Sequence, residues 1–178
     1  MFNLAGLSED IETYIQTASA SYNVPVPLIK AIIKIESDYR PSVYKQEPHV
    51  KDASWGLMQV LLSTAKWISG NNDLTASQLM DPSFNIYVGT KYLAYLMGRY
   101  SKLTDVMAAY NAGSPRLDAS GKYVNQSYVD KASKWYATYA TTEKVKATIV
   151  QATSGSSALP IGLVAIGILS AILLLRRR

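Results

Sequence analysis

Apolar residues recur along much of the chain at three- and four-residue spacing, which predicts amphipathic helices. Residues 40–54 lack this pattern and are expected to form an irregular loop. The last helix is expected to break near residues 141–142. The expected helices cover residues 8–22, 27–39, 83–100, 104–112 and 125–150, and a turn followed by a shorter amphipathic helix lies between 56 and 65.

The helix at 27–39 carries the residue of greatest chemical interest, Glu36. Ile29, Ile33 and Glu36 fall at i, i+4 and i+7 and therefore share one face. Apolar neighbours and the negative end of the helix dipole both disfavour the charged carboxylate and raise its pKa. A carboxyl with a raised pKa suits a general acid near neutral pH. The alternative is a glutamate at a helix end whose head reaches water.

An uncharged stretch of 18 residues, 158–175, lies near the end of the chain. As a helix it would be about 27 Å long, close to the hydrocarbon core of about 30 Å. Residues 151–157 read as a flexible linker before it, and 176–178 are three arginines that form a basic stop. We therefore expect a domain over 1–150 and a transmembrane helix over 158–175. A buried core helix is the alternative, which the linker and the arginines disfavour.

The charge distribution predicts how the expected span is oriented. The positive-inside tendency places the terminal arginines on the cytoplasmic side and the rest of the chain across the membrane. Gly167 and Ala171 have the small-xxx-small spacing that favours helix pairing in lipid.

Residues 1–7 contain neither a positive n-region nor a long apolar core, so no secretory signal is expected there.

Composition excludes several classes of site. The chain has no cysteine, and its one histidine, His49, lies in a polar stretch that reads as a loop. A thiolate nucleophile, a histidine-based triad and a multi-histidine metal site are thereby excluded. The net charge is +5, of which the three terminal arginines supply three, so the rest of the chain is only mildly basic. That balance is not typical of a nucleic-acid-binding protein.

Two further stretches contain side chains that could bind a sugar. Gln59 follows Gly56-Leu57-Met58 and offers both a donor and an acceptor. Tyr110 and Asn111 come at the end of a short helix, just before Gly113. Read locally, the first stretch is a turn leading into a helix with a buried Met58, and the second is a capped surface helix.

In their order and spacing, these segments resemble the lytic transglycosylase (SLT-type) domain, whose fold is similar to goose-type lysozyme. The likeness spans roughly residues 20–137. The matching segments are Ile35-Glu36-Ser37, Gly56-Leu57-Met58-Gln59, Asp81-Pro82, Asn85-Ile86, Gly89, Tyr92-Leu93, Ala109-Tyr110-Asn111-Ala112-Gly113 and Tyr128-Val129.

The resemblance implies a mostly α, lysozyme-like domain that cleaves the β-1,4 bond between N-acetylmuramic acid and N-acetylglucosamine in peptidoglycan. Glu36 would be the sole catalytic acid/base and would give a 1,6-anhydromuramoyl product. The family needs neither metal nor cofactor. Substrate-binding or supporting roles would fall to Ser37, Met58, Gln59, Tyr110, Asn111 and Tyr128. Many relatives have Glu-Thr before the last-motif tyrosine, where this chain has Val124 and Asn125.

The number of candidate catalytic carboxylates fits a mechanism that uses a single acid. Most glycosidases use two, about 5–5.5 Å or about 6.5–9.5 Å apart. No other carboxylate has a claim comparable to that of Glu36. Asp38 points elsewhere on its helix, and Glu47 and Asp52 lie in a loop whose path the sequence does not give.

A chain of this size with a C-terminal anchor is similar to virion-associated transglycosylases of membrane-containing phages. We therefore expect a single-pass protein of a virion membrane or of a bacterial inner membrane, with its catalytic domain facing the cell wall. Its expected partners are glycan strands and, through residues 158–175, lipid. The alternatives are a non-catalytic peptidoglycan-binding anchor and a holin-like protein that permeabilises membranes.

Overall fold

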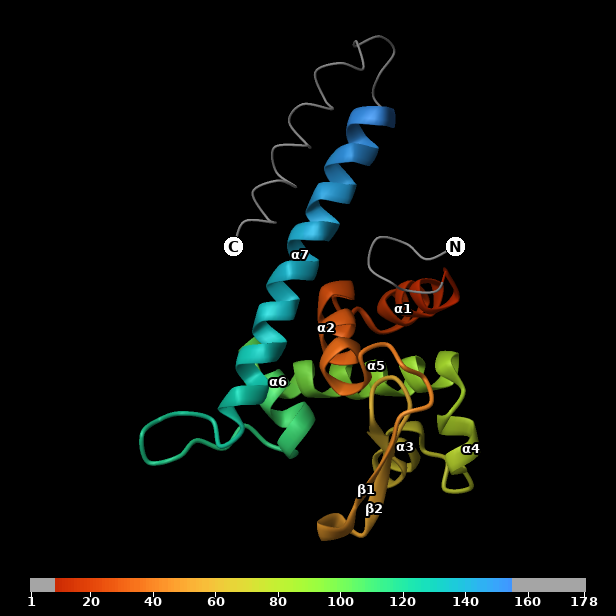
Figure 1. Cartoon of the computed structure of the whole chain (residues 1–178), viewed down its shortest axis with the longest axis vertical. Coiled ribbons are helices and arrows are strands. Elements are labelled where there is room, and N and C mark those ends of the chain that lie inside the picture. The colour runs from red at the N-terminus through yellow and green to blue at the C-terminus, as the bar shows by residue number, and fades with distance from the viewer. Residues whose placement is uncertain (1–8, 155–178) are drawn as a thin grey trace. The chain divides into compact units, whose positions relative to one another are not determined.

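The computed structural model describes residues 9–154 and is mostly helical, as predicted (Figure 1). It divides after Thr141, so residues up to 141 form one compact unit and residues from 142 belong to a second. The elements in order are α1 (Glu9–Tyr22), α2 (Val26–Ser37), β1 (Tyr44–Glu47), the 3-10 helix η1 (Pro48–Val50), β2 (Asp52–Trp55), β3 (Val60–Leu61), α3 (Leu62–Ser69), α4 (Ala76–Leu79), α5 (Pro82–Arg99), α6 (Leu103–Ala112) and α7 (Gln126–Ser154).

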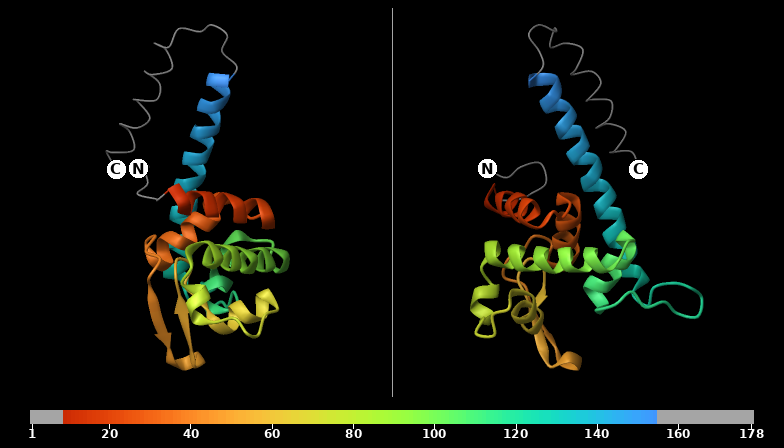
Figure 2. Two further views of the ribbon diagram at one scale, coloured as in Figure 1. Left: turned by 90° about the vertical axis from the view of Figure 1, so that its right-hand side faces the viewer. Right: turned by 180° about the vertical axis from the view of Figure 1, so that it is seen from behind.

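Helix α5 is the central element of the first unit, and it contacts α1, α3, α4 and α6 (Figure 2). It begins after Asp81, whose side chain caps it by accepting a hydrogen bond from the backbone N–H of Phe84. Leu93 of α5 and Ile29 and Ile33 of α2 are fully buried. Burial of each such side chain contributes about 1.5–3 kcal/mol. The core therefore fixes α2, the helix that carries Glu36.

Residues 40–54 do not form the irregular loop that we expected. They contain an antiparallel hairpin in which β1 pairs with β2, with Tyr44 opposite Trp55 and Glu47 opposite Asp52. Two interactions stabilise it: the rings of Tyr44 and Trp55 lie 4.5 Å apart, and a carboxylate oxygen of Asp52 accepts a 2.9 Å bond from the N–H of Ser63. Because these interactions join distant residues, the polar sequence of the hairpin gave no local sign of strands.

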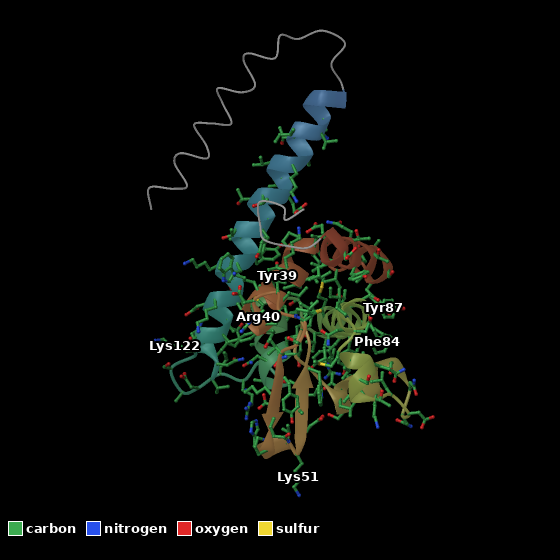
Figure 3. The ribbon with its side chains drawn as sticks, turned by 45° about the vertical axis from the view of Figure 1, so that its right-hand side comes forward. Tyr39, Arg40, Lys51, Phe84, Tyr87 and Lys122 are labelled. Atoms are coloured by element: carbon green, nitrogen blue, oxygen red, sulfur yellow. The ribbon has the colours of Figure 1, made fainter. Side chains whose placement is uncertain are left out.

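Helix α2 ends at Ser37, two residues earlier than predicted. Asp38 and Tyr39 have φ values of 53° and 61°, in the left-handed region. The N–H of Asp38 still bonds to the carbonyl of Lys34, which closes the last turn. Figure 3 shows Tyr39 and Arg40 directly after the helix, whereas Lys51 lies at the far tip of the hairpin. The early stop leaves Glu36 in the final turn of α2.

Helix α7 is continuous through residues 141–142, where a break was predicted. The hydroxyls of Thr138 and Thr141 donate to carbonyls one turn back, at 3.0 and 2.9 Å, so both threonines fit the helix without a break. The helix continues to Ser154, and residues 151–154 of the expected linker are therefore helical.

No helix within residues 9–154 has the length and apolar character needed to cross a membrane. The predicted transmembrane segment 158–175, the arginines that follow it and the first residue of the predicted helix 8–22 lie outside the described residues.

Candidate active site

A hydrogen bond between two distant parts of the chain defines the candidate site. The hydroxyl of Tyr128, in the first turn of α7, donates to Oε1 of Glu36 at 2.7 Å. Both side chains are partly buried. The bond places the carboxyl of Glu36 at the junction of α2 and α7.

The surroundings of Glu36 raise its pKa to about 7. Burial is the largest cause, because it removes water from the charged form. The hydrogen bond from Tyr128 and the positive charge of Lys45 lower the pKa, and the negative charge of Glu47 raises it. Burial therefore outweighs the two stabilising interactions, and a substantial fraction of Glu36 is protonated at neutral pH.

Tyr110 of α6 interacts electrostatically with the same carboxyl. Its hydroxyl donates to the backbone carbonyl of Met58 at 2.9 Å. Burial and the negative charge of Glu36 hold its pKa, and that of Tyr128, well above the ordinary value. Both phenols therefore remain donors throughout the range in which Glu36 titrates.

The backbone of the loop Gly56–Gln59 is held by Asn85 of α5, which is fully buried. The amide oxygen of Asn85 accepts from the N–H of Met58 at 2.8 Å. Its amide nitrogen donates to the carbonyls of Trp55 and Leu79 at 2.8 and 2.9 Å. All three bonds are to backbone groups, so Asn85 fixes the position of the loop that bonds to Tyr110.

Two glycines allow this loop to approach α5 closely. Gly56 has a φ of 73°, and a Cβ there would lie 2.5 Å from the amide nitrogen of Asn85. A Cβ on Gly89 would lie 2.6 Å from the sulfur of Met58. The loop therefore packs closely against α5 at both glycines, and Met58 is fully buried, as its local sequence predicted.

Ser37 and Gln59 are bound within the protein. The hydroxyl of Ser37 lies 2.7 Å from the carbonyl of Leu57, which ties the end of α2 to the loop. The amide nitrogen of Gln59 donates to the carbonyls of Val43 and Gly56, at 3.0 and 2.9 Å. Its amide oxygen accepts from the hydroxyl of Ser54 at 3.0 Å. Gln59 therefore stabilises the base of the hairpin through these three hydrogen bonds. That its side chain binds a sugar stays a prediction.

Asn111 is exposed at the end of α6, and its amide oxygen accepts a 2.9 Å bond from Asn125. Asn125 also donates to the carbonyl of Ala108 at 3.1 Å. Sequence reasoning treated Asn125 only as a departure from the family pattern. In the structure it orients Asn111, and no local signal in the sequence indicates that contact.

Comparison with known protein families assigns the domain. The family model for the transglycosylase SLT domain matches residues 13–135. The chain belongs to the SLT transglycosylase domain family.

The SLT domain has relatives in bacteria and in a phage. It is 34% identical over 113 residues to a membrane-bound lytic murein transglycosylase C of Photorhabdus laumondii, covering 56% of this chain and 30% of that one. It is 29% identical over 120 residues to a transglycosylase of Enterobacteria phage PRD1, covering 67% of this chain and 40% of that one. The chain thus spans well under two thirds of the length of either relative.

A solved structure shares the fold of the SLT domain. It is a 70-kDa soluble lytic transglycosylase in complex with bulgecin A. The match has a TM-score of 0.62 and 25% identity, and it covers 78% of this chain and 25% of that one. The lysozyme-like helical fold inferred from the motifs is confirmed.

Among the other carboxylates weighed in the sequence, Glu47 acts electrostatically on Glu36 in the SLT domain. Glu47 of β1 is 15% exposed and forms a 2.7 Å ion pair with Lys45. Asp52 instead accepts backbone bonds from Ala53 and Ser63, and Asp38 is exposed and bonds to Lys34. Residues 9–154 contain no cluster of three or more histidine or acidic side chains that could hold a metal ion.

Proposed function

We propose that the SLT domain is a peptidoglycan lytic transglycosylase that uses Glu36 as its only acid/base. The observation that carries the proposal is the partly buried carboxyl of Glu36, with a pKa of about 7 and a 2.7 Å hydrogen bond from Tyr128. Such a group can give up a proton at neutral pH and take one back. The names of the relatives, murein transglycosylases, support peptidoglycan as the substrate.

The proposed reaction balances with this single carboxyl. Protonated Glu36 gives its proton to the glycosidic oxygen, and the bond from that oxygen to C1 of N-acetylmuramic acid breaks. The resulting carboxylate then removes the proton from the 6-hydroxyl of the same sugar. The 6-oxygen attacks C1 and closes the 1,6-anhydro ring, and Glu36 is protonated again. This lyase-type cleavage consumes no water.

The supporting residues have separate roles in the proposal. Tyr128 stabilises the carboxylate between the two proton transfers. Tyr110 and Ser37 fix the loop around Met58 against the end of α2 through their hydrogen bonds to its carbonyls. Asn111, Met58 and Gln59 are proposed to line or support the glycan site.

A zymogram containing peptidoglycan tests the proposal. The purified full-length chain should clear the gel, and Glu36→Gln should not. Asp73→Asn is the matched control, because it makes the same chemical change at an exposed site and should clear normally. Equal clearing by Glu36→Gln and the wild type would exclude Glu36 as the acid. Glycan binding by a wild type that clears nothing would instead identify a non-catalytic anchor.

The product is tested separately by mass spectrometry of the released fragments. Anhydromuramoyl ends are 18 Da lighter than hydrated ends, a difference of one water. Anhydro ends support the internal 6-hydroxyl as the nucleophile. Hydrated ends would retain Glu36 as the acid but replace that nucleophile by water.

We also propose that residues 158–175 anchor the domain to a membrane, with the domain facing a bacterial cell wall. There the domain would either open the wall locally for a phage or remodel it for the bacterium. The uncharged sequence of the segment supports this, as do a relative named membrane-bound and a relative from a phage. The full-length chain should sediment with membranes, and a chain ending at residue 157 should not. Equal sedimentation of both would refute the anchor.

A further inference from the structure

Two consecutive residues after α2, Asp38 and Tyr39, adopt the left-handed conformation, with φ values of 53° and 61°. Residues other than glycine adopt this conformation uncommonly, and then usually singly. Such strained residues persist only where the surrounding structure holds them, and they are concentrated at functional sites. Because Glu36 lies three residues before Tyr39, the contacts that hold this turn are candidates for a role in positioning the carboxyl.

The phenol of Tyr39 holds the turn against two helices. Its hydroxyl donates to the backbone carbonyl of Lys30, further back on α2, at 3.1 Å. Burial and a side-chain hydrogen bond with Tyr139 of α7 both raise the pKa of Tyr39. Tyr139 is itself only 9% exposed. The phenol of Tyr39 therefore joins the end of α2 to α7 (Figure 3).

A second set of contacts joins the same two helices. The ammonium of Lys34, on α2, lies 5.0 Å from the ring centre of Trp135 on α7, a favourable cation–π distance. Lys34 also forms an ion pair with Asp38. The ring of Trp135 stacks on that of Tyr139, with centroids 5.8 Å apart and 27° between the planes. These contacts form a closed ring, because Asp38 precedes Tyr39 in the chain.

We refer to Lys34, Asp38, Tyr39, Trp135 and Tyr139 as the α2–α7 cluster. All five residues precede residue 142 and belong to the first compact unit. The cluster uses the face of α7 that carries Tyr128, because Tyr128, Trp135 and Tyr139 follow at i, i+7 and i+11. The bond from Tyr128 to Glu36 and the cluster therefore lie along the same contact between α2 and α7.

We propose that Tyr39 is a positioning residue of the catalytic site, which fixes the end of α2 against α7 and so keeps the carboxyl of Glu36 within hydrogen-bonding distance of Tyr128. This inference rests on the proposed function, in which Glu36 is the acid/base. Tyr39 acts through Tyr128 rather than on the substrate. Loss of its hydroxyl should therefore lengthen and weaken the bond to Glu36, since such bonds depend steeply on geometry.

The pKa of Glu36 reports on this bond directly. The charged and titratable groups that act on Glu36 are Tyr128 of α7, Tyr110 of α6, and Lys45 and Glu47 of β1. Tyr39→Phe alters none of these groups, and it keeps the aromatic ring of residue 39. A change in the pKa of Glu36 in this variant therefore comes from a displacement of Glu36 relative to them.

NMR titration of the full-length chain in detergent micelles, labelled with carbon-13 at its glutamate carboxyls, measures this pKa without turnover. The signal of Glu36 is the one that Glu36→Gln lacks. We expect Tyr39→Phe and Tyr139→Phe each to raise the pKa of Glu36 by about 0.5–1 pH unit, part of the rise of about 1–2 pH units expected when a charge-assisted bond is lost completely. The alkaline limb of the clearing profile should move with it.

The matched control is Tyr22→Phe. Tyr22 of α1 is hydrogen-bonded to the side chain of Tyr87 on α5, so this variant breaks a pair of phenols of the same kind elsewhere in the domain. It should leave the pKa of Glu36 and the rate of clearing unchanged. An equal rise of that pKa in Tyr22→Phe would show a general loss of packing and would overturn the inference.

A double variant distinguishes positioning from destabilisation. With Tyr128→Phe already present, Tyr39→Phe should raise the pKa of Glu36 no further, because the bond through which it acts is gone. An unchanged pKa in Tyr39→Phe, or an equal rise with and without Tyr128, would overturn the inference. The titration does not depend on cleavage. A wild type that clears no peptidoglycan but shows this coupling removes only the proposed catalysis, and one that clears it without the coupling removes only the role of Tyr39.

Discussion

The hydroxyl of Tyr128 donates to the carboxyl of Glu36 at 2.7 Å, across 92 residues of sequence. The bond joins the start of α7 to the end of α2. The bond stabilises the ionised carboxyl, whereas burial destabilises it. Burial has the larger effect, and the pKa of Glu36 therefore rises to about 7. This balance determines the pH at which Glu36 can act as an acid.

Tyr128→Phe removes the hydrogen bond that lowers the pKa of Glu36. We therefore expect that pKa to rise further, so the alkaline limb of the lytic pH profile moves to higher pH. The maximal rate should fall about tenfold or more, because the carboxylate formed after the first proton transfer loses a charge-assisted bond. Clearing rates of purified peptidoglycan between pH 5 and 9 measure both effects.

The matched control is Tyr87→Phe, at an exposed tyrosine of α5 (Figure 3). Tyr87 packs its ring against Tyr22 at 4.9 Å and should leave the profile unchanged. An alkaline limb that stays in place in Tyr128→Phe would show that the bond does not control Glu36.

Lys45 and Glu47 act on Glu36 in opposite directions. They are two residues apart on β1 and so lie on one face of the strand. Glu47→Gln removes a negative charge, so the pKa of Glu36 should fall and the alkaline limb should move to lower pH. Lys45→Met removes a positive charge and should move the limb to higher pH. The double variant should lie between the two.

Salt distinguishes this electrostatic effect from a change in structure. The side chain of Lys45 is 68% exposed, so its influence should weaken between about 0.01 and 1 M salt. An electrostatic origin would be contradicted if the alkaline limb moved in the same direction in both single variants, or if the shift in Lys45→Met did not depend on salt concentration.

Ionisation of Glu36 should cost stability. Its folded-state pKa of about 7 lies above the ordinary 4.5, so the folded chain binds its proton more tightly than the unfolded chain. The free energy of unfolding therefore falls as pH rises from about 4.5 to about 7. Glu36→Gln cannot ionise and should be more stable than the wild type at pH 8 by about 1–3 kcal/mol.

Urea unfolding of both chains at pH 4 and pH 8 measures this difference. The two should be nearly equal at pH 4, where Glu36 is protonated in both states. A constant difference at the two pH values would mean that the substitution acts through packing rather than charge.

The helices, and the place of Glu36 on the buried face of its helix, were predictable because local periodicity determines them. Glu36 lies in line with Ile29 and Ile33, and both isoleucines are buried as their spacing implied. The motif order also indicated the fold correctly, because it depends on several segments rather than one.

The hairpin and the hydrogen bonds of the loop were not predictable in the same way. The pairing of β1 with β2 depends on contacts of Tyr44 with Trp55 and of Asp52 with Ser63. Gln59 has a φ of 47°, a conformation that a glutamine rarely adopts and that no local pattern indicates. In this conformation the side-chain amide of Gln59 lies towards the hairpin. The contact between Asn125 and Asn111 likewise needs the loop between them to fold.

Gly89 and Gly98 provide the final prediction, because they lie on the same helix in opposite surroundings. A Cβ on Gly89 would lie 2.6 Å from the sulfur of Met58 and 3.0 Å from its Cβ, whereas a Cβ on Gly98 would meet nothing within 4 Å. Gly89→Ala should therefore overpack the core and destabilise the fold by about 1–3 kcal/mol. Gly98→Ala should stabilise it by about 0.5–1 kcal/mol, because alanine favours a helix over glycine.

Activity should separate the two glycine variants as well. Met58 is the residue whose carbonyl receives the hydroxyl of Tyr110, so displacement of Met58 by Gly89→Ala should disturb the position of Tyr110 beside Glu36. Lytic rates measured below the unfolding temperature of each variant should fall in Gly89→Ala and stay at the wild-type value in Gly98→Ala. A Gly89→Ala chain that is destabilised yet fully active would mean that the loop absorbs the displacement before it reaches Tyr110, and that the close approach to α5 serves stability alone.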